Sequence, residues 1–193
     1  MNKGERVNFA ECSIRREEEL REIVGSPHEA VIKKTITQLD DHCRRFISIS
    51  PLLFLATSDE EGRGDVSPRG DEPGFVQVLN SSQLVIPERP GNRRVDSLRN
   101  ILRNPHVGLI FLIPGMEEVL RINGRAYVIK GNEQDKASLL GIGVEVEECF
   151  IHCPRALKHS GIWNMESWPD REKLPSMMEM FREHLKINGF ILN

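Results

Sequence analysis

This sequence of 193 residues lacks most of the features that assign a function by themselves. No apolar run approaches the roughly 20 residues that a helix needs to cross a bilayer. Residues 1–6 contain none of the apolar segment of a signal peptide. The net charge of −3 gives no electrostatic reason to expect a nucleic-acid partner. We therefore expect one globular domain in the cytoplasm, with no membrane or nucleic-acid partner.

Cysteine is also scarce, and the four cysteines cannot build a disulfide framework for a chain of this length. The segment Cys149-Phe-Ile-His152-Cys153 does bring three soft ligands together, so a metal site has to be considered. Spaced pairs of ligands are missing, however, and there is no Cys-x-x-Cys. This favours reduced thiols near a strand end, and we predict no metal site.

Helical patterns flank the central part of the chain. Apolar spacing predicts a helix over 13–24, and Ser26-Pro27-His28-Glu29 has the residue types of a helix start. The spacing of Ile32, Ile36, Leu39, Cys43 and Phe46 then predicts one long amphipathic helix, which we interpret as a covering or dimer-contact helix without chemistry. Near the other end, short helices are predicted over 133–140 and 153–160, and a final helix opens at Ser176 and runs to about Ile187.

Between them, apolar runs separated by turn residues predict six strands, at 52–57, 75–79, 83–88, 106–113, 119–130 and 144–151. Polar residues 65–71 are flanked by strand signals, and Pro68 there requires a bent or edge position. One helix, 96–105, falls between strands and ends at Asn104-Pro105. Because a parallel sheet would need more helices between its strands, we expect an antiparallel β-barrel in an α+β fold. The expected organisation is N-terminal helices over 13–46, a barrel over about 52–152 and a helical segment over 154–193.

An arginine-rich loop leads into the central helix, with Arg93, Arg94, Asp96 and Ser97 close together. Arginine offers a planar fork of donors that suits phosphate oxygens, and a helix N-terminus adds free backbone N–H groups. The alternative is an ordinary basic surface loop with Asp96 as the cap, and the spacing alone does not decide between them.

Two further polar clusters are present. Ser67 and Arg69 alternate onto one face of their segment, which is either a concave ligand face or a solvated hairpin. Near the C-terminal end, Trp163 could stack on a planar ligand and Lys158 could meet an anionic oxygen, or this segment simply covers the barrel mouth. The residue types alone favour the plainer interpretation in both places.

No nucleophile and base arrangement, His-Glu-x-x-His, Walker loop or Gly-x-Gly-x-x-Gly fingerprint occurs in the sequence. We therefore assign no catalytic residue. A phosphate-suited loop without acid–base or metal groups suggests a cofactor that brings its own reactivity.

The stretch 83–126 resembles the pyridoxamine 5′-phosphate oxidase-like FMN-binding split barrels. The resemblance is carried by Gln83-Leu-Val-Ile-Pro87, the Arg93-Arg94 pair, Asn104-Pro105, the strand 107–111 and Gly124-Arg125-Ala126. It extends from about Leu52 to Trp163, and the segment 149–160 is similar to a motif of an uncharacterised branch of the family. It implies a six-stranded antiparallel split β-barrel with flanking helices, in a homodimer that holds FMN at the subunit interface.

Carried over by position, the resemblance gives each candidate residue a role. Ser67, Pro68 and Arg69 would lie along the flavin and its ribityl chain, and Ile86 and Pro87 would offer backbone contacts. Arg94 and Ser97, with Arg93, would hold the phosphate. Arg121 falls on a strand position that faces the cofactor in relatives, and Lys158 and Trp163 would come from the partner subunit.

One departure from the family concerns the substrate. The oxidase itself ends in an Arg-x-His element that holds pyridoxal phosphate, and nothing like it follows Trp163. We therefore expect an FMN-dependent oxidoreductase, a flavin reductase or oxidase, acting on another small molecule. The alternatives are a non-catalytic flavin or haem binder, with His106, His152 and His159 as candidate haem ligands, and a deazaflavin-dependent reductase.

Overall fold

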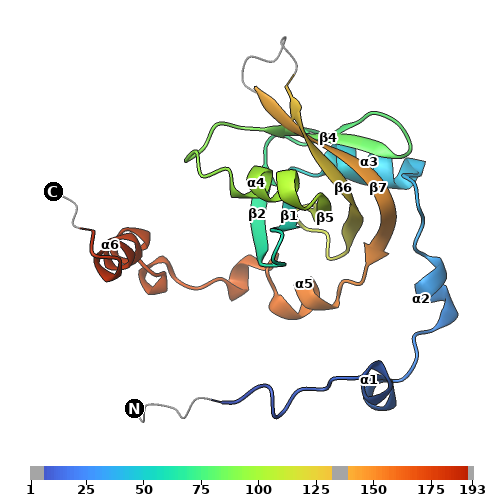
Figure 1. The fold of residues 1–193 in the computed structure, drawn as a ribbon, viewed down its shortest axis with the longest axis horizontal. Helices are drawn as coiled ribbons and strands as arrows, with labels where there is room; N and C mark the ends of the chain where they lie inside the picture. The colour runs from blue at the N-terminus through green and yellow to red at the C-terminus, as the bar shows by residue number, and fades with distance from the viewer. Residues whose placement is uncertain (1–6, 132–138, 191–193) are drawn as a thin grey trace.

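The computed structural model describes residues 7–131 and 139–190, and its centre is one curled antiparallel sheet with helices around it (Figure 1). The strands follow one another in space in the order β2-β1-β5-β6-β7-β4-β3. Their bounds are β1 Leu52–Ser58, β2 Gly64–Gly70, β3 Gln77–Val78, β4 Gln83–Glu88, β5 His106–Leu112, β6 Val119–Lys130 and β7 Leu140–His152. The α+β fold predicted from the sequence is confirmed.

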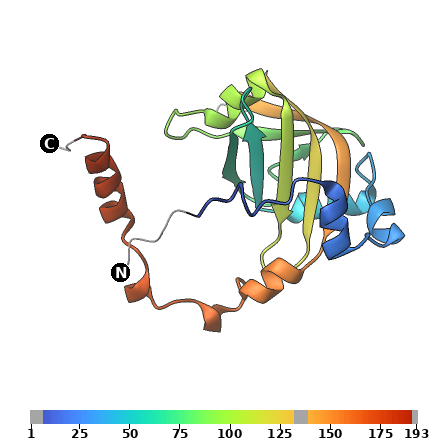
Figure 2. The same ribbon diagram turned by 60° about the horizontal axis from the view of Figure 1, so that its bottom comes forward.

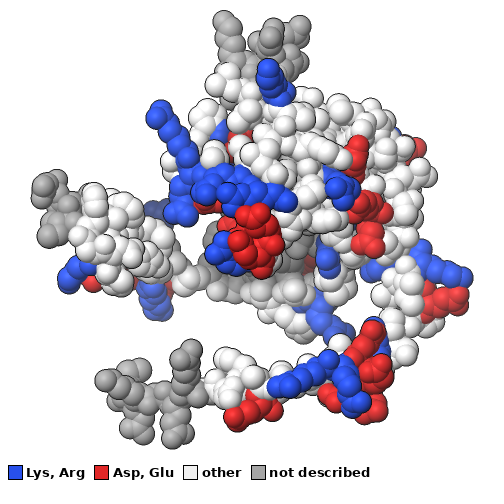
Figure 3. Space-filling model, in the orientation of Figure 1, with Lys and Arg blue, Asp and Glu red and all other residues white. Residues whose placement is uncertain are grey.

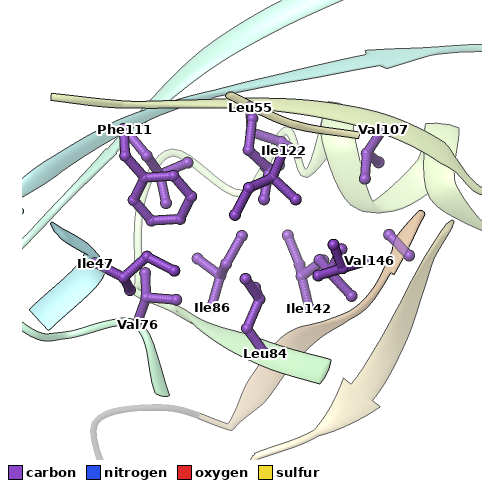
Figure 4. Close-up of a cluster of buried hydrophobic side chains, with 14 of the residues drawn as sticks. Ile47, Leu55, Val76, Leu84, Ile86, Val107, Phe111, Ile122, Ile142 and Val146 are labelled. Atoms are coloured by element: carbon purple, nitrogen blue, oxygen red, sulfur yellow. The ribbon is translucent and has the colours of Figure 1, made fainter. Parts of the chain in front are cut away.

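The sheet curls so that its inner face encloses the hydrophobic core. Figure 4 shows Leu84, Ile86 and Ile142, from β4 and β7, pointing toward Leu55 and Ile122 on the other half of the sheet. All five side chains are fully buried. This facing arrangement is what the alternating burial along each strand produces when one sheet bends over itself.

The predicted strand count is wrong, because the sheet formed by the described residues has seven strands and is not closed. The additional strand is β2, the polar segment with Pro68, which pairs only with β1 among the described residues. A proline without an N–H fits such an edge position, since no second neighbour needs that donor. The other edge is the two-residue strand β3, shorter than the predicted strand 75–79.

The helices are α1 Glu17–Val24, α2 Glu29–Lys33, α3 Asp41–Ile49, α4 Asp96–Arg103, α5 Arg155–Ser160 and α6 Met177–Ile187, with 3₁₀ turns η1 Met165–Ser167 and η2 Arg171–Lys173. Helix α4 packs against β1, β2 and β6, and its Leu98 and Ile101 enter the core. Helix α3 contributes Cys43 and Ile47 to the same core. Within the described residues, no helix is long and apolar enough to cross a membrane.

The long N-terminal helix predicted from apolar spacing is also wrong, because the chain is extended between α2 and α3. Ile36 exchanges two backbone hydrogen bonds with Cys149, at 3.0 and 2.7 Å, and the β-branched run around it favours this extended form. Asp40 then starts a new helix by accepting the Cys43 N–H at 2.8 Å. His28, not Ser26, caps α2. The prediction of a core-facing side holds for Leu39 and Cys43 but not for the exposed Ile32.

The two ends of the chain form arms that leave the sheet. In Figure 1 the arm with α1 and α2 lies below and to the right of the sheet, whereas the arm that ends in α6 extends to its left, as it also does in Figure 2. The predicted start of α6 is confirmed, because the Ser176 hydroxyl accepts the Glu179 N–H. Of the helix predicted over 133–140, residues 133–138 lie outside the described residues, while Leu140 belongs to strand β7.

Candidate cofactor site

A pocket of about 610 Å³ lies where the free edge strand β2, the end of β4 and the start of α4 come together. Its volume falls within the roughly 300–1,000 Å³ typical of small-molecule sites. The lining includes seven charged side chains, with Arg69, Arg89, Arg93 and Arg94 against Asp65, Glu88 and Asp96. Figure 3 shows basic and acidic side chains next to one another over this loop and α4.

Strand β2 supplies one wall through the alternation of its side chains. Asp65, Ser67 and Arg69 point to the pocket side and are half-buried, whereas Val66 and Pro68 point outward and are exposed. Because successive side chains of a strand point to opposite faces of the sheet, this polar row lies together on the pocket side of β2.

An ion pair links β2 to β4 across the opening of the sheet. Arg69 Nη1 donates to Glu88 Oε1 at 2.9 Å, and the two side chains are only 19% and 16% exposed. The two strands are not neighbours in the sheet, so this pair forms only because the sheet curls. The Nε of Arg69 is buried and has no hydrogen-bond partner among the described residues. A buried donor without a partner is costly, and a ligand acceptor in the pocket would satisfy it.

The loop from β4 to α4 supplies the second wall. Arg93 and Val95 both have positive φ angles, 65° and 50°, a region that β-branched residues rarely adopt. Val95 precedes the first turn of α4 and no side chain caps that helix. The free N–H groups of its first turn therefore carry the partial positive charge of the helix dipole at the edge of the pocket.

The first turn of α4 is tied to β2 by hydroxyl contacts. Ser97 is almost fully buried, and its Oγ lies 3.0 Å from Ser67 Oγ and 3.4 Å from Asp65 Oδ2. This contact holds the two walls of the pocket at a fixed spacing.

The other arginines reach further out. Arg94 donates to Asp96 at 2.8 Å while its side chain stays 74% exposed, and this hydrogen bond raises the pKa of Arg94. Arg89 donates to Asp71 at 2.6 Å. The pKa of Asp71 is lowered first by the backbone N–H of Glu72 and then by Arg89. The exposed cations can thus change partners when an anion enters, at little cost.

The structure brings five of the eleven candidate residues together in this pocket. They are Ser67, Arg69, Arg93, Arg94 and Ser97. Pro68 is on the outer face of β2, the side chain of Ile86 is in the core, and Pro87 follows it in β4. Arg121 lies on the outer face of β6 over the Phe150 ring. Lys158 is on α5, and Trp163 donates its indole N–H to the Met116 carbonyl, both away from the pocket of their own chain.

Sequence reasoning missed several lining residues. Asp65 could have been found, since it belongs to the same alternating row as Ser67 and Arg69. Glu88 had no such signal, because its pairing with Arg69 depends on how the whole sheet curls. Leu139, just before β7, and Leu140, its first residue, also line the pocket and were predicted to be helical.

The other candidate groups do not reach this pocket. Cys43 and Cys149 are buried with their sulfur atoms 3.4 Å apart, whereas Cys12 and Cys153 are exposed, and all four are free thiols. In the described part of the chain, no group of three or more His, Cys, Asp or Glu side chains could hold a metal ion. His106, His152 and His159, all described, are not among the lining residues.

Comparison with known families identifies the class of protein. The sequence model of the pyridoxamine 5′-phosphate oxidase family matches residues 39–145, more than half of the chain. The chain belongs to this family, as its resemblance to the split barrels predicted.

Solved structures match the chain at low identity. A Lactobacillus delbrueckii protein proposed to be a pyridoxamine 5′-phosphate oxidase is 21% identical, with a TM-score of 0.49, covering 60% of this chain and 95% of its own. HutZ, the haem storage protein from Vibrio cholerae, is 18% identical with a TM-score of 0.41, covering 60% and 94%. An FAD-binding protein from Mesorhizobium loti is 14% identical with a TM-score of 0.40, covering 62% and 99%. A search of curated proteins finds no match.

Proposed function

We propose that this protein is an FMN-dependent oxidoreductase that acts on a small molecule in the cytoplasm. The observation that carries the proposal is the pocket at the uncapped start of α4, where arginine side chains, hydroxyls and free backbone N–H groups converge. Membership of the pyridoxamine 5′-phosphate oxidase family supports it, and the four free thiols are consistent with a reducing compartment.

The residues at the start of α4 suit the phosphate end of the cofactor. The first-turn N–H groups and the Ser97 hydroxyl offer short hydrogen bonds to phosphate oxygens, and Arg93 and Arg94 add mobile positive charge. Arg94 would exchange its present partner, Asp96, for the phosphate. The half-buried Asp65 accepts a hydrogen bond from the Ser97 hydroxyl and would orient it.

The residues between β2 and β4 suit the polar edge of a flavin ring. Arg69 is held in place by Glu88 and keeps one buried donor, its Nε, for a ligand acceptor. Ser67 lies between this arginine and the phosphate end, where it can reach the ribityl hydroxyls. A bound flavin would supply hydride or electron transfer, and the protein's part is to bind, orient and shield it.

The proposal includes a homodimer with the cofactor at the subunit interface. The pocket of one chain is lined by β2, the end of β4, the loop into α4, the start of α4, Leu139 and Leu140, and we propose that a partner chain completes it. Arg121, Lys158 and Trp163 lie away from the pocket of their own chain, which leaves them available to contact the cofactor of a second chain.

The test is reconstitution with FMN. Purified protein is titrated into FMN while flavin fluorescence is followed, and FAD, riboflavin, a deazaflavin and haem are titrated in parallel. We expect saturable binding of FMN, with riboflavin much weaker because it lacks the phosphate. Equal affinity for riboflavin and FMN would contradict a phosphate site at α4. Tighter binding of haem or of the deazaflavin than of FMN would show that the protein uses that cofactor instead.

Catalysis is tested separately on the loaded protein. Reduced nicotinamide nucleotides are added without oxygen, and the bleaching of bound FMN is followed by absorbance. Reduction followed by reoxidation with an acceptor supports an oxidoreductase. Bound FMN that no donor reduces would favour a flavin-binding protein without turnover.

A further inference from the structure

A second cluster of positive charge lies on the outer face of the sheet, where β6 and β7 pair. Arg121 and Phe150 are directly opposite each other in the register of these strands. The guanidinium carbon of Arg121 lies 5.0 Å from the centre of the Phe150 ring, and Lys34 Nζ lies 5.9 Å from the same centre. His152 follows Phe150 on the same face of β7. Side chains from distant parts of the sequence therefore share one small area.

Each of the two permanent cations is held in place. Lys34 donates to the Ile151 carbonyl at 2.8 Å, and the extended segment that carries it is fixed by the pairing of Ile36 with Cys149. Arg121 is placed by its strand and by its position over the aromatic ring. Holding two long cationic side chains in position costs conformational entropy, and the site is thereby prepared before any ligand arrives.

No carboxylate neutralises this cluster within the described residues. Neither Lys34 nor Arg121 forms an ion pair there, whereas eight other described arginines do. The neighbouring carboxylate on this face, Glu148, instead accepts a hydrogen bond from Asn123 at 2.8 Å. Cation–π attraction to one ring offsets only part of the repulsion between like charges.

The pKa of His152 responds to the same excess of positive charge. Its pKa is lowered first by burial, and then by the positive charges of Arg121 and Lys34. An anion bound between these groups would remove that effect and let the imidazole act as a third donor.

We propose that Lys34, Arg121 and His152 form a binding site for the carboxylate or phosphate group of a small molecule. Two cations held near one aromatic ring, with an imidazole on the same face of β7, match the charge and the donor needs of such a group. The site is on the outer face of β6 and β7, whereas the α4 pocket opens between β2 and β4. In the proposed dimer it would hold the acidic group of the substrate beside the cofactor, and only this last step depends on the proposed function.

The test is anion binding by the full-length protein without added flavin. Inorganic phosphate and acetate are titrated separately at constant ionic strength, while the imidazole resonances of His152 are followed by NMR. We expect saturable shifts with at least one anion, and the tighter one identifies the preferred group. Arg121→Gln and Lys34→Gln are each expected to weaken binding by at least about tenfold, or ~1.4 kcal/mol.

The chain offers a matched control for each variant. Lys33→Gln removes the neighbouring lysine, which pairs with Glu29 instead. Arg125→Gln removes an arginine on the same face of β6, about 13 Å along the strand and opposite Glu145. Both controls should bind like the wild type. Shifts that do not saturate, or equal losses in controls and test variants, would overturn the site and leave cation–π packing as the role of these side chains. Because Lys34 is exposed, its variant remains informative even if Arg121→Gln folds poorly.

Discussion

Arg94 stands between two residues whose backbone angles cost energy. A left-handed conformation costs an L-residue about 1–2 kcal/mol, and both Arg93 and Val95 adopt it. Such strain persists only when surrounding contacts enforce it, and it is common at ligand sites. Here it turns the chain sharply, so that Arg94 and the uncapped turn of α4 face the same pocket.

Arg94→Ala is therefore expected to weaken FMN binding by at least about tenfold, because a charged hydrogen bond to phosphate is lost. Riboflavin binding should change little, since it has no phosphate. Arg103→Ala is the matched control, because Arg103 lies at the other end of α4 and pairs with Glu60. Fluorescence titration of both variants with both ligands measures the effect. An FMN affinity that is the same in both variants would place the phosphate elsewhere.

The four cysteines should differ in reactivity, because Cys12 and Cys153 are exposed whereas Cys43 and Cys149 are buried. Burial raises the pKa of both Cys43 and Cys149, so the thiolate form that reacts is suppressed as well as hidden. We expect a disulfide reagent to modify Cys12 and Cys153 quickly in the native protein and the buried pair only upon unfolding. A Cys12→Ser, Cys153→Ser variant should lose the fast phase. Four thiols reacting at one rate would contradict the packing of α3 against β7.

At the scale of elements, the start of α3 depends on one side chain. Asp40 caps this helix, and the pKa of Asp40 is lowered mainly by the hydrogen bond from the Cys43 N–H. Asp40→Ala should cost about 1 kcal/mol of unfolding free energy, whereas Asp40→Asn keeps a capping oxygen and should cost less. Chemical denaturation measures both.

The depressed pKa of Asp40 also predicts the pH dependence. A carboxyl whose folded pKa lies below its unfolded value stabilises the fold above the unfolded pKa, and this contribution is lost as pH falls through the folded pKa. The ionised Asp40 should thus lose its advantage over Asp40→Asn as the pH is lowered below about 4. A difference between the two proteins that stays constant down to pH 3, about one unit below the unfolded value, would argue against the cap.

The elements that the sequence predicted best are those set by local pattern. The apolar strand at 106–113 and the helix that ends before Asn104-Pro105 both appear within two residues of the predicted ends. The break between α2 and α3 could not be predicted, because it depends on Ile36 pairing with Cys149, which is remote in sequence. Strand β2 was underestimated because a polar edge strand has no apolar run to mark it.

The candidate site likewise contains residues that local sequence pattern predicted and residues that it did not. Ser67 and Arg69 were placed on one face by simple alternation, and Arg93, Arg94 and Ser97 by their position at a helix start. The pairing of Arg69 with Glu88 escaped prediction, because it joins strands that are not neighbours and so depends on the curvature of the sheet. Residues proposed to act from a second subunit, such as Trp163, cannot be placed by either the sequence or a single chain.

At the scale of the whole molecule, the outer face of β1, β2 and β5 carries exposed apolar side chains. Phe54 lies opposite Pro68 on one side and Ile110 on the other, and Val66 is next to them at 65% exposed. A continuous apolar patch of this kind marks an interface in a soluble protein. It lies on the outer side of the same strand, β2, whose inner side lines the pocket, so a partner seated there would also reach the cofactor.

Val66→Glu is therefore expected to disrupt the proposed homodimer, because it would place a charge in the apolar contact. Val66 is exposed in the single chain, so the fold should be unaffected. The wild type should sediment as a dimer and the variant as a monomer, and the variant should also bind FMN more weakly. Leu102→Glu is the control, since Leu102 is 73% exposed on α4 away from this face. A wild type that binds FMN fully while it sediments as a monomer would show that one chain suffices, and the roles proposed for Lys158 and Trp163 would then be withdrawn.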